Sequence, residues 1–261
     1  MKKVLTATIL IFVVLLGCVQ TKTDTKSESA ALGPIISLSA EQLVEFNDDF
    51  NTFREDLWEK SYHLFREDAK SRYAAADVEI QAGQLVVTTK KGALSSATLG
   101  SNFLLVGDFD IQIDISIDFD LSIPMRQNAH FSLWHKGNNA TIIFERLSRK
   151  KVVMKMRRDK VSVGHIQGST VKQKSFSEFT GSVRAVRRDK KITYFYRNKM
   201  DVDWKKLYKT RFTAGDAGVS LGLKNFYIGS SSNPSVTGVC SVRYDNFKIN
   251  AAEKIIEGDE I

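Results

Sequence analysis

The most regular pattern of hydrophobic and polar positions is the stretch GDFDIQIDISIDFDLSI, residues 107–123. Every second residue from Phe109 to Ile123 is apolar, and the residues between them are mostly aspartate and serine. Successive side chains of a β-strand point to opposite faces, so this alternation predicts a long strand with its apolar row buried. The acidic row is predicted to face outward, where it meets either water or a ligand.

Similar segments, separated by turn residues, run through most of the chain. They include DVEIQAGQLVVTTKK (77–91), AHFSLWHKG (129–137) and GVCSVRYDNFKI (238–249). Apart from a short helical turn in SLSAEQLVEF (37–46), no helical pattern is long enough to cross between parallel strands. The prediction is an all-β chain that folds as a two-sheet antiparallel β-sandwich of the jelly-roll type.

The N-terminus predicts export. Two lysines and a short apolar run are typical of a signal peptide over residues 1–17. The tetrapeptide LLGC that ends at Cys18 resembles the lipobox of bacterial lipoproteins, which implies cleavage before Cys18 and lipid on its sulfur. The expected order is then a flexible tether (18–35), the sandwich domain (36–250) and a C-terminal tail (251–261). The expected location is the bacterial cell envelope, lipid-anchored to a membrane and facing the periplasm or the exterior.

Charge and cysteine content refine this picture. The formal net charge is +8, and loss of the signal peptide would remove two lysines. Basic residues concentrate in 146–160 and 183–199, which fits either an anionic lipid or polysaccharide partner or a solvated sheet edge. Nucleic acid is not an expected partner of an exported protein. Cys240 is predicted to be a buried, inert thiol, because a lipid on Cys18 leaves it no disulfide partner.

The order of these segments resembles that of concanavalin A-like lectin/glucanase domains over roughly residues 46–250. FNDDFN (46–51) resembles their opening strand, GDFDIQIDISI (107–117) their long strand and VRYDNFKI (242–249) their closing strand. The resemblance implies a jelly roll of two curved sheets with a carbohydrate site on the concave face. The protein is therefore expected to bind an oligo- or polysaccharide.

The hydrolases of this group carry a cluster of two glutamates and an aspartate after the strand that FSLW resembles. The equivalent stretch here, NNATIIFERL (138–147), has only Glu145, while Thr141 and Ile143 stand at the other two positions. The resemblance therefore argues against that hydrolytic mechanism, and a non-catalytic carbohydrate-binding domain is expected.

The alternative is a divergent glycoside hydrolase that uses carboxylates of the 108–120 strand. Asp110, Asp114 and Asp118 share one face of this strand. Same-face neighbours on a strand lie about 6.6–7 Å apart, which is near the separation of an inverting carboxylate pair. The regular row offers no apolar neighbour that would keep one carboxyl protonated, so solvent or ligand contact is the competing interpretation.

The candidate carbohydrate-binding residues come from three segments. Their common feature is a polar or aromatic side chain on a potential outer face, and they are Gln112, Asp114, Ser116, Trp134, Tyr194 and Tyr196. Trp134 faces outward if Phe131 and Leu133 are in the core, and inward otherwise. Tyr194 and Tyr196 alternate with Phe195, so one of the two sets is expected to face outward.

No cofactor is expected from the sequence. The four histidines lack the spacing of metal ligands. The resemblance implies a possible structural calcium ion near the first and last strands, where Asp48, Asp49 and Asp245 supply carboxylates. Turn capping is the alternative role for these three aspartates.

Overall fold

The computed structural model describes residues 32, 34–61, 73–91, 94–119, 126–135, 138–148, 151–162, 165–176, 178–226 and 238–258. The predicted signal peptide, Cys18 and nearly all of the predicted tether lie outside these residues. Within the described residues, no helix is both long and apolar enough to span a bilayer.

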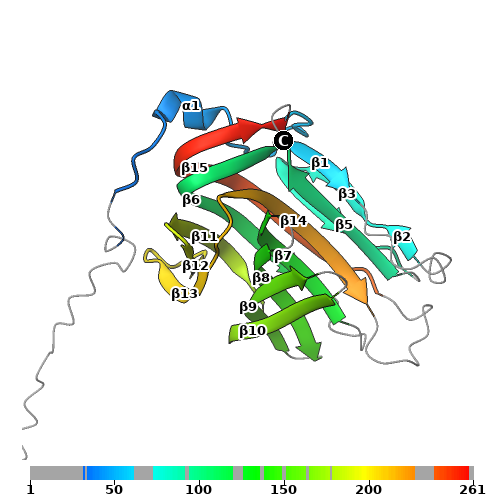
Figure 1. Ribbon diagram of the computed structural model, residues 1–261. Helices are drawn as coiled ribbons and strands as arrows, with labels where there is room; N and C mark the ends of the chain where they lie inside the picture. The colour runs from blue at the N-terminus through cyan, green and yellow to red at the C-terminus, as the bar shows by residue number, and fades with distance from the viewer. Residues whose placement is uncertain are drawn as a thin grey trace, which may run out of the picture.

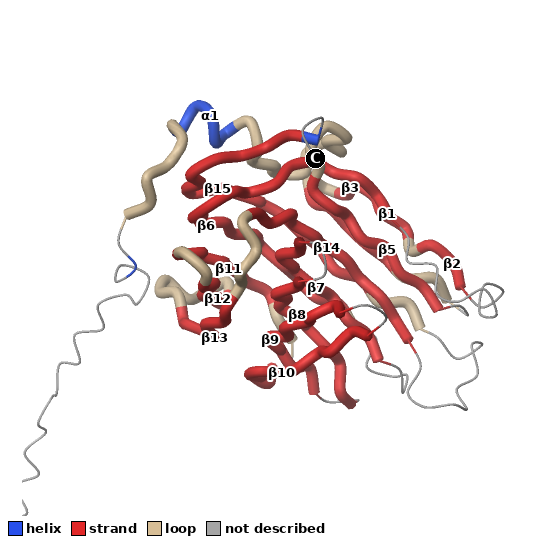
Figure 2. The backbone as a smooth tube through the Cα atoms, viewed as in Figure 1, coloured by secondary structure: helices blue, strands red, loops and turns tan. Residues whose placement is uncertain are grey.

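Mainly antiparallel strands form two sheets that pack face to face, as the ribbon and tube views show (Figures 1 and 2), and a short pairing of residues 216–217 with 105–106 joins the two sheets at one edge. In spatial order, sheet I contains β3 (Asp77–Gln81), β4 (Gln84–Thr88), β15 (Ser241–Glu257), β6 (Phe103–Asp118), β11 (Thr180–Arg188), β12 (Lys191–Asn198) and β13 (Lys205–Arg211). Sheet II contains β10 (His165–Phe176), β9 (Lys151–Ser162), β8 (Asn138–Ser148), β7 (Arg126–His135), β14 (Asp216–Phe226) and β5 (Leu94–Ser101), with β1 (Trp58–Ser61) and β2 (Tyr73–Ala75) along the outer edge of β5. The predicted all-β, two-sheet antiparallel sandwich is confirmed.

The one described α-helix precedes the sandwich. Helix α1 (Ala40–Val44) begins at Ser39, whose side chain accepts a hydrogen bond from the backbone N–H of Gln42. The Gln42 side chain accepts from the Ser39 N–H in return, so the two residues form a capping box. The helical turn predicted within residues 37–46 is therefore confirmed.

The long alternating strand is β6, and it lies inside sheet I between β11 and β15. Phe109, Ile111, Ile113 and Ile115 are at most 2% exposed and face sheet II. Each such side chain contributes about 1.5–3 kcal/mol when it is fully buried. The predicted inward direction of the apolar row is confirmed over these residues, and the polar residues between them face outward.

The sandwich extends further toward the C-terminus than predicted. Residue 250 was expected to end the domain, but β15 continues to Glu257 and pairs with β6 as far as Phe103. Its register shifts three times, between Asp245 and Lys248, Ile249 and Ala251, and Ala252 and Lys254. These irregularities break the alternation in the sequence, which explains why the strand could not be recognised beyond residue 250.

Two buried tyrosines connect the sheets. The Tyr194 hydroxyl of β12 donates to the carbonyl oxygen of Ala140 in β8 at 2.8 Å. The Tyr244 hydroxyl of β15 reaches the carbonyl oxygens of His130 and Gly222 at 2.8 Å each. Burial raises the pKa of both phenols, so they remain protonated. They thereby satisfy strand carbonyls between the layers and fix the two sheets relative to each other.

Cys240 lies just before β15 and is 1% exposed, as predicted for a buried thiol. Its backbone N–H donates to the Thr89 hydroxyl at 3.0 Å, and its sulfur lies 3.3 Å from the same oxygen. The side chain is therefore part of the packing between the ends of β4 and β15.

Candidate functional site

The acidic row of β6 is held by partners from the neighbouring strands. Asp110, which is 7% exposed, accepts from Arg184 Nε at 2.7 Å and from Asn250 Nδ2 at 3.2 Å. A second nitrogen of Arg184 contacts the other carboxylate oxygen, so the pair is bidentate. These bonds run across β11, β6 and β15, and they stabilise the outer face of sheet I.

Asp114 and its neighbours extend the same network. Asp114 accepts from Ser182 Oγ at 2.6 Å and from Asn246 Nδ2 at 3.1 Å. Ser116 Oγ lies 3.0 Å from Thr180 Oγ1, and Gln112 Oε1 accepts from Asn250 Nδ2 at 3.3 Å. The predicted binding residues of β6 therefore face outward, but their polar groups already bond to adjacent strands.

A hollow of about 440 Å³ lies at this end of sheet I. Asp114, Ser116, Ser182, Arg197 and Arg243 are among the side chains that line it. They come from four adjacent strands, β12, β11, β6 and β15, and present guanidinium, carboxylate and hydroxyl groups together.

The outer face of sheet II carries the one predicted aromatic residue that faces outward. Phe131 and Leu133 of β7 are fully buried, so Trp134 points to the opposite side and is half-buried. It pairs with Gly218 of β14, and a Cβ atom built on Gly218 would lie 2.5 Å from the indole Cε2. The ring therefore rests directly on the backbone of β14, where only glycine leaves room for it.

The side chains around Trp134 are small or polar. His130 approaches Gly222 as Trp134 approaches Gly218, and its Nε2 lies 3.3 Å from Ser220 Oγ. Ser132 Oγ lies 2.6 Å from Thr141 Oγ1 of β8. We call the outward side of β7, β8 and β14 the Trp134 face. It combines an aromatic ring with hydroxyl and imidazole groups, an arrangement that suits a polar ligand with apolar patches.

The stretch equivalent to the hydrolase cluster lies on the β8 part of this face. Glu145 of β8 is ion-paired with Lys155 of β9, and its side chain is 7% exposed. Thr141 bonds to Ser132, and Ile143 is half-buried on the same side of the strand. The three positions therefore hold one carboxylate, already paired, together with a hydroxyl and an alkyl group.

The predicted binding residues do not form one site. Gln112, Asp114 and Ser116 lie on the outer face of sheet I, whereas Trp134 lies on the outer face of sheet II. The core separates these two faces. The prediction of a single groove formed by the long strand and Trp134 is wrong, because β6 and β7 belong to different sheets despite being consecutive in the chain.

Tyr194 and Tyr196 are also not surface residues. They are 0% and 4% exposed and face the core, and Phe195 between them is 1% exposed. The Tyr196 hydroxyl bonds to Lys174 of β10. The prediction of ligand contact by these tyrosines is wrong, because both sides of β12 are covered and the alternation therefore leaves no exposed set.

The calcium candidates serve other purposes. Asp48 is 4% exposed and accepts from the Phe50 N–H at 2.7 Å and from Trp58 Nε1 at 2.8 Å. Burial raises the pKa of its carboxyl group. Asp49 accepts from Asn51 and Asp245 from Gln84 and Asn246, and the described residues contain no group of three or more His, Cys, Asp or Glu side chains suited to a metal. The arrangement does not fit a calcium ion.

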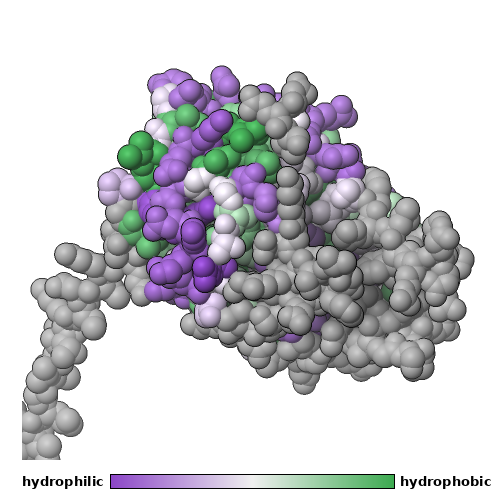
Figure 3. Space-filling model, viewed as in Figure 1, coloured by the Kyte–Doolittle hydropathy of each residue, from purple (hydrophilic) through white to green (hydrophobic). Residues whose placement is uncertain are grey.

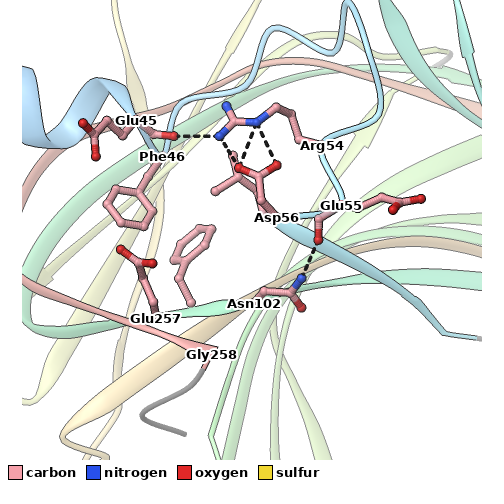
Figure 4. A pocket seen from close by; sticks show the side chains of 10 residues that line it. Glu45, Phe46, Arg54, Glu55, Asp56, Asn102, Glu257 and Gly258 are labelled. Carbon is pink, nitrogen blue, oxygen red and sulfur yellow. Dashed lines mark hydrogen bonds and ion pairs between the residues drawn. The ribbon is translucent and has the colours of Figure 1, made fainter.

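A larger cavity, of about 670 Å³, lies where the N-terminal segment crosses the ends of β6 and β15 (Figure 4). Arg54 bonds to Asp56 and to the carbonyl oxygen of Glu45, and Asn102 donates to the Glu55 carbonyl oxygen at 2.9 Å. The bond with Arg54 lowers the pKa of Asp56. These contacts hold the segment onto the sandwich, and the carboxylates of Glu45, Glu55 and Glu257 also line the cavity.

Several residues of the Trp134 face were missed from the sequence. Gly218, Ser220 and Gly222 occupy alternate outward positions of β14, in the stretch GVSLG. Alternating small residues in a strand signal close approach of another group. The sequence therefore indicated that side chains lie close to β14. It could not identify them as Trp134 and His130, because the order of the strands in the sheet was not known.

Comparisons with known proteins identify the fold. No protein-family model matches the chain, and no curated protein matches its sequence. A Bacteroides ovatus GH16 protein of a mixed-linkage glucan PUL, in complex with the product G4G4G3G, superposes with a TM-score of 0.59 at 14% identity, covering 78% of this chain and 99% of that one. A Mycobacterium marinum β-1,3-glucanase gives 0.56 at 11% identity, covering 84% and 99%.

A third similar structure is the CBM2 module of the evolved Dit of Lactobacillus casei BL23 phage J-1. Its TM-score is 0.53 at 10% identity, with coverage of 79% of this chain and 95% of that one. The chain therefore has the concanavalin A-like jelly-roll fold, as the resemblance in the sequence predicted. At these identities the similarity defines the fold, and a function must be argued from the site.

The contact between Trp134 and Gly218 can be tested by substitution. We expect Gly218→Ala to lower the free energy of unfolding by about 1–3 kcal/mol, because its methyl group would displace the indole ring. Urea denaturation followed by tryptophan fluorescence measures this change.

Gly100→Ala is the matched control, because a Cβ at Gly100 of β5 has no atom within 4 Å. This variant should be neutral or more stable by about 0.4–1 kcal/mol. Equal effects of the two substitutions would contradict the proposed packing of Trp134.

Proposed function

We propose that this protein is a lipid-anchored protein of the bacterial cell envelope whose jelly-roll domain binds carbohydrate without cleaving it. The Trp134 face is the proposed binding surface. The observation that supports it best is the half-buried indole of Trp134, which lies on Gly218 beside hydroxyl-bearing neighbours.

The physical basis is the mixed character of a sugar ring. Its C–H face packs against an aromatic ring, while its hydroxyl groups exchange hydrogen bonds with polar side chains. On this face Asn139 of β8 pairs directly with Trp134, and the polar side chains that follow along β7, β8 and β14 are Ser132, Thr141, Ser220 and His130. The sheet fixes all of them, so little conformational entropy is lost on binding.

The proposal that the domain does not cleave carbohydrate rests on Thr141, Ile143 and Glu145, which occupy the positions equivalent to the hydrolase cluster. Cleavage of a glycosidic bond requires two carboxyl groups on opposite sides of the bond. Thr141 and Ile143 supply none, and Glu145 is ion-paired with Lys155. We therefore propose binding rather than hydrolysis.

The alternative, a divergent hydrolase that uses the 108–120 strand, has less support. Asp110 is bound by Arg184 and Asn250, and Asp114 by Ser182 and Asn246. Carboxylates held in this way are poorly placed to exchange protons or attack a sugar. Release of reducing sugar by the purified protein, abolished by Asp114→Asn, would favour this alternative.

Trp134→Ala tests the binding surface. We expect the purified full chain to bind laminaritriose or a mixed-linkage glucan tetrasaccharide, and Trp134→Ala to weaken binding at least tenfold, or about 1.4 kcal/mol, in isothermal titration calorimetry. The matched control is Trp204→Ala, which removes a half-buried indole on the side of sheet I and should bind as the unchanged protein does. The proposal would be contradicted if Trp204→Ala abolished binding while Trp134→Ala retained it.

The proposed membrane anchor depends on the tetrapeptide LLGC, whose last residue is Cys18. Cys18→Ser removes the sulfur to which lipid would be attached. We expect the unchanged protein in the detergent-soluble membrane fraction of cells and the variant outside it. Equal membrane retention of the two proteins would show that Cys18 does not anchor the chain.

A further inference from the structure

We propose that the hollow on the outer face of sheet I is a second binding site, which takes the carboxylate groups of an acidic oligosaccharide. It is separate from the Trp134 face, because the two lie on different sheets with the core between them. Its occupant is therefore independent of the ligand proposed for that face.

Two arginines stand on opposite sides of the hollow. Arg197 of β12 pairs with Ser182 of β11, Ser182 with Asp114 of β6, and β6 pairs in turn with β15, which carries Arg243. Three spacings between adjacent strands, at ~4.8 Å each, place their backbones about 14 Å apart. The two guanidinium groups can therefore approach one ligand from both ends.

The carboxylates of the hollow are already bonded within the protein. Asp245 accepts from Gln84 Nε2 at 3.2 Å and from the Asn246 N–H at 2.7 Å. Asp201 accepts from Lys205 Nζ at 2.7 Å and from the Asn198 side chain at 2.9 Å. Asp114 is held by Ser182 and Asn246, as described above. All three carboxylates are thus hydrogen-bonded within the protein, and Asp201 is also ion-paired with Lys205.

The guanidinium groups of Arg197 and Arg243 have fewer hydrogen bonds within the protein than the carboxylates have. Arg197 donates from Nε to Ser182 Oγ at 3.3 Å, and its guanidinium lies 4.5 Å from the Trp204 ring centroid. Within the described residues, the terminal nitrogens of Arg197 and the whole guanidinium of Arg243 have no protein partner. The stacking on Trp204 holds Arg197 in place before a ligand arrives.

The chemistry of these groups indicates the ligand. A guanidinium binds a carboxylate through two parallel hydrogen bonds, which a neutral sugar cannot provide. Ser116 and Thr180, which lie between the arginines, can bond to hydroxyl groups. The volume of about 440 Å³ lies within the range of small-ligand sites. A short chain of uronic acids offers carboxylates and hydroxyls together.

The surroundings agree with a charged ligand. Figure 3 shows hydrophilic residues gathered over the β12–β13 hairpin, next to the hollow. Lys199 lines the hollow, and Lys206 lies at the start of β13 beside Lys205, which is already paired with Asp201. These exposed charges attract an anion over several ångströms and make its binding sensitive to salt.

Calorimetry with the purified full chain tests the proposal. The probes are trigalacturonate, trimannuronate and a hyaluronan tetrasaccharide, each compared with its carboxyl-reduced form. We expect at least one acidic probe to bind at least tenfold more tightly than its reduced form. Arg243→Gln should weaken that binding at least tenfold, whereas Arg243→Lys should weaken it less, because the charge remains.

Lys248→Gln is the matched control, because it removes an exposed positive charge from the same strand outside the hollow. Lys248→Gln should change the affinity for the acidic probe less than twofold. Trp134→Ala should also change it less than twofold, because Trp134 lies on the other sheet; this result would distinguish the second site from the Trp134 face. The proposal is overturned if no acidic probe binds more tightly than its reduced form, or if Lys248→Gln and Arg243→Gln weaken binding equally. It is also overturned if Arg243-dependent binding occurs only to phosphatidylglycerol vesicles or inorganic phosphate.

Discussion

The pairing of β6 with β11 on one side and β15 on the other is the constraint on which the sheet I side of the molecule depends. A shift of one residue in either register would turn the isoleucines outward and the aspartates into the core. The correct register places Asp110 against Arg184 and Asn250, so the buried apolar row and the bonded polar row stabilise the same arrangement. The acidic row thereby acts as a set of cross-strand ties, which explains why its carboxylates are occupied.

Much of the fold follows from alternation alone. The apolar row of β6, the outward direction of Trp134 opposite Phe131, and the absence of a carboxylate cluster around Glu145 could all be predicted from the sequence. Alternation defines the two faces of a strand, but it does not identify the neighbouring strands. Asp110 and Arg184 are 74 residues apart, so their contact could not be recognised. For the same reason, two residues of consecutive strands, Asp114 and Trp134, were placed in one groove although they lie on different sheets.

The sandwich presents two outer faces with different chemistry. On sheet II, glycines of β14 leave room for Trp134 and His130 among hydroxyl groups, an environment that favours a neutral sugar. On sheet I, arginines flank carboxylates that other side chains already hold, which favours an anion. The jelly roll separates these faces by a full hydrophobic core, so each can change its ligand without disturbing the other. On the two proposals above, the faces would bind different parts of a polysaccharide of mixed composition.

A double-mutant cycle on Asp110 and Arg184 tests most directly whether the acidic row holds sheet I together. Urea denaturation of the unchanged protein, Asp110→Asn, Arg184→Gln and the double variant gives the coupling free energy between the two side chains. Because both are largely buried and joined by charge-assisted bonds, the account predicts a coupling of about 1.5–3 kcal/mol. A coupling below about 0.5 kcal/mol would contradict the account, because the pair of Asp110 and Arg184 would then contribute little to the stability of sheet I.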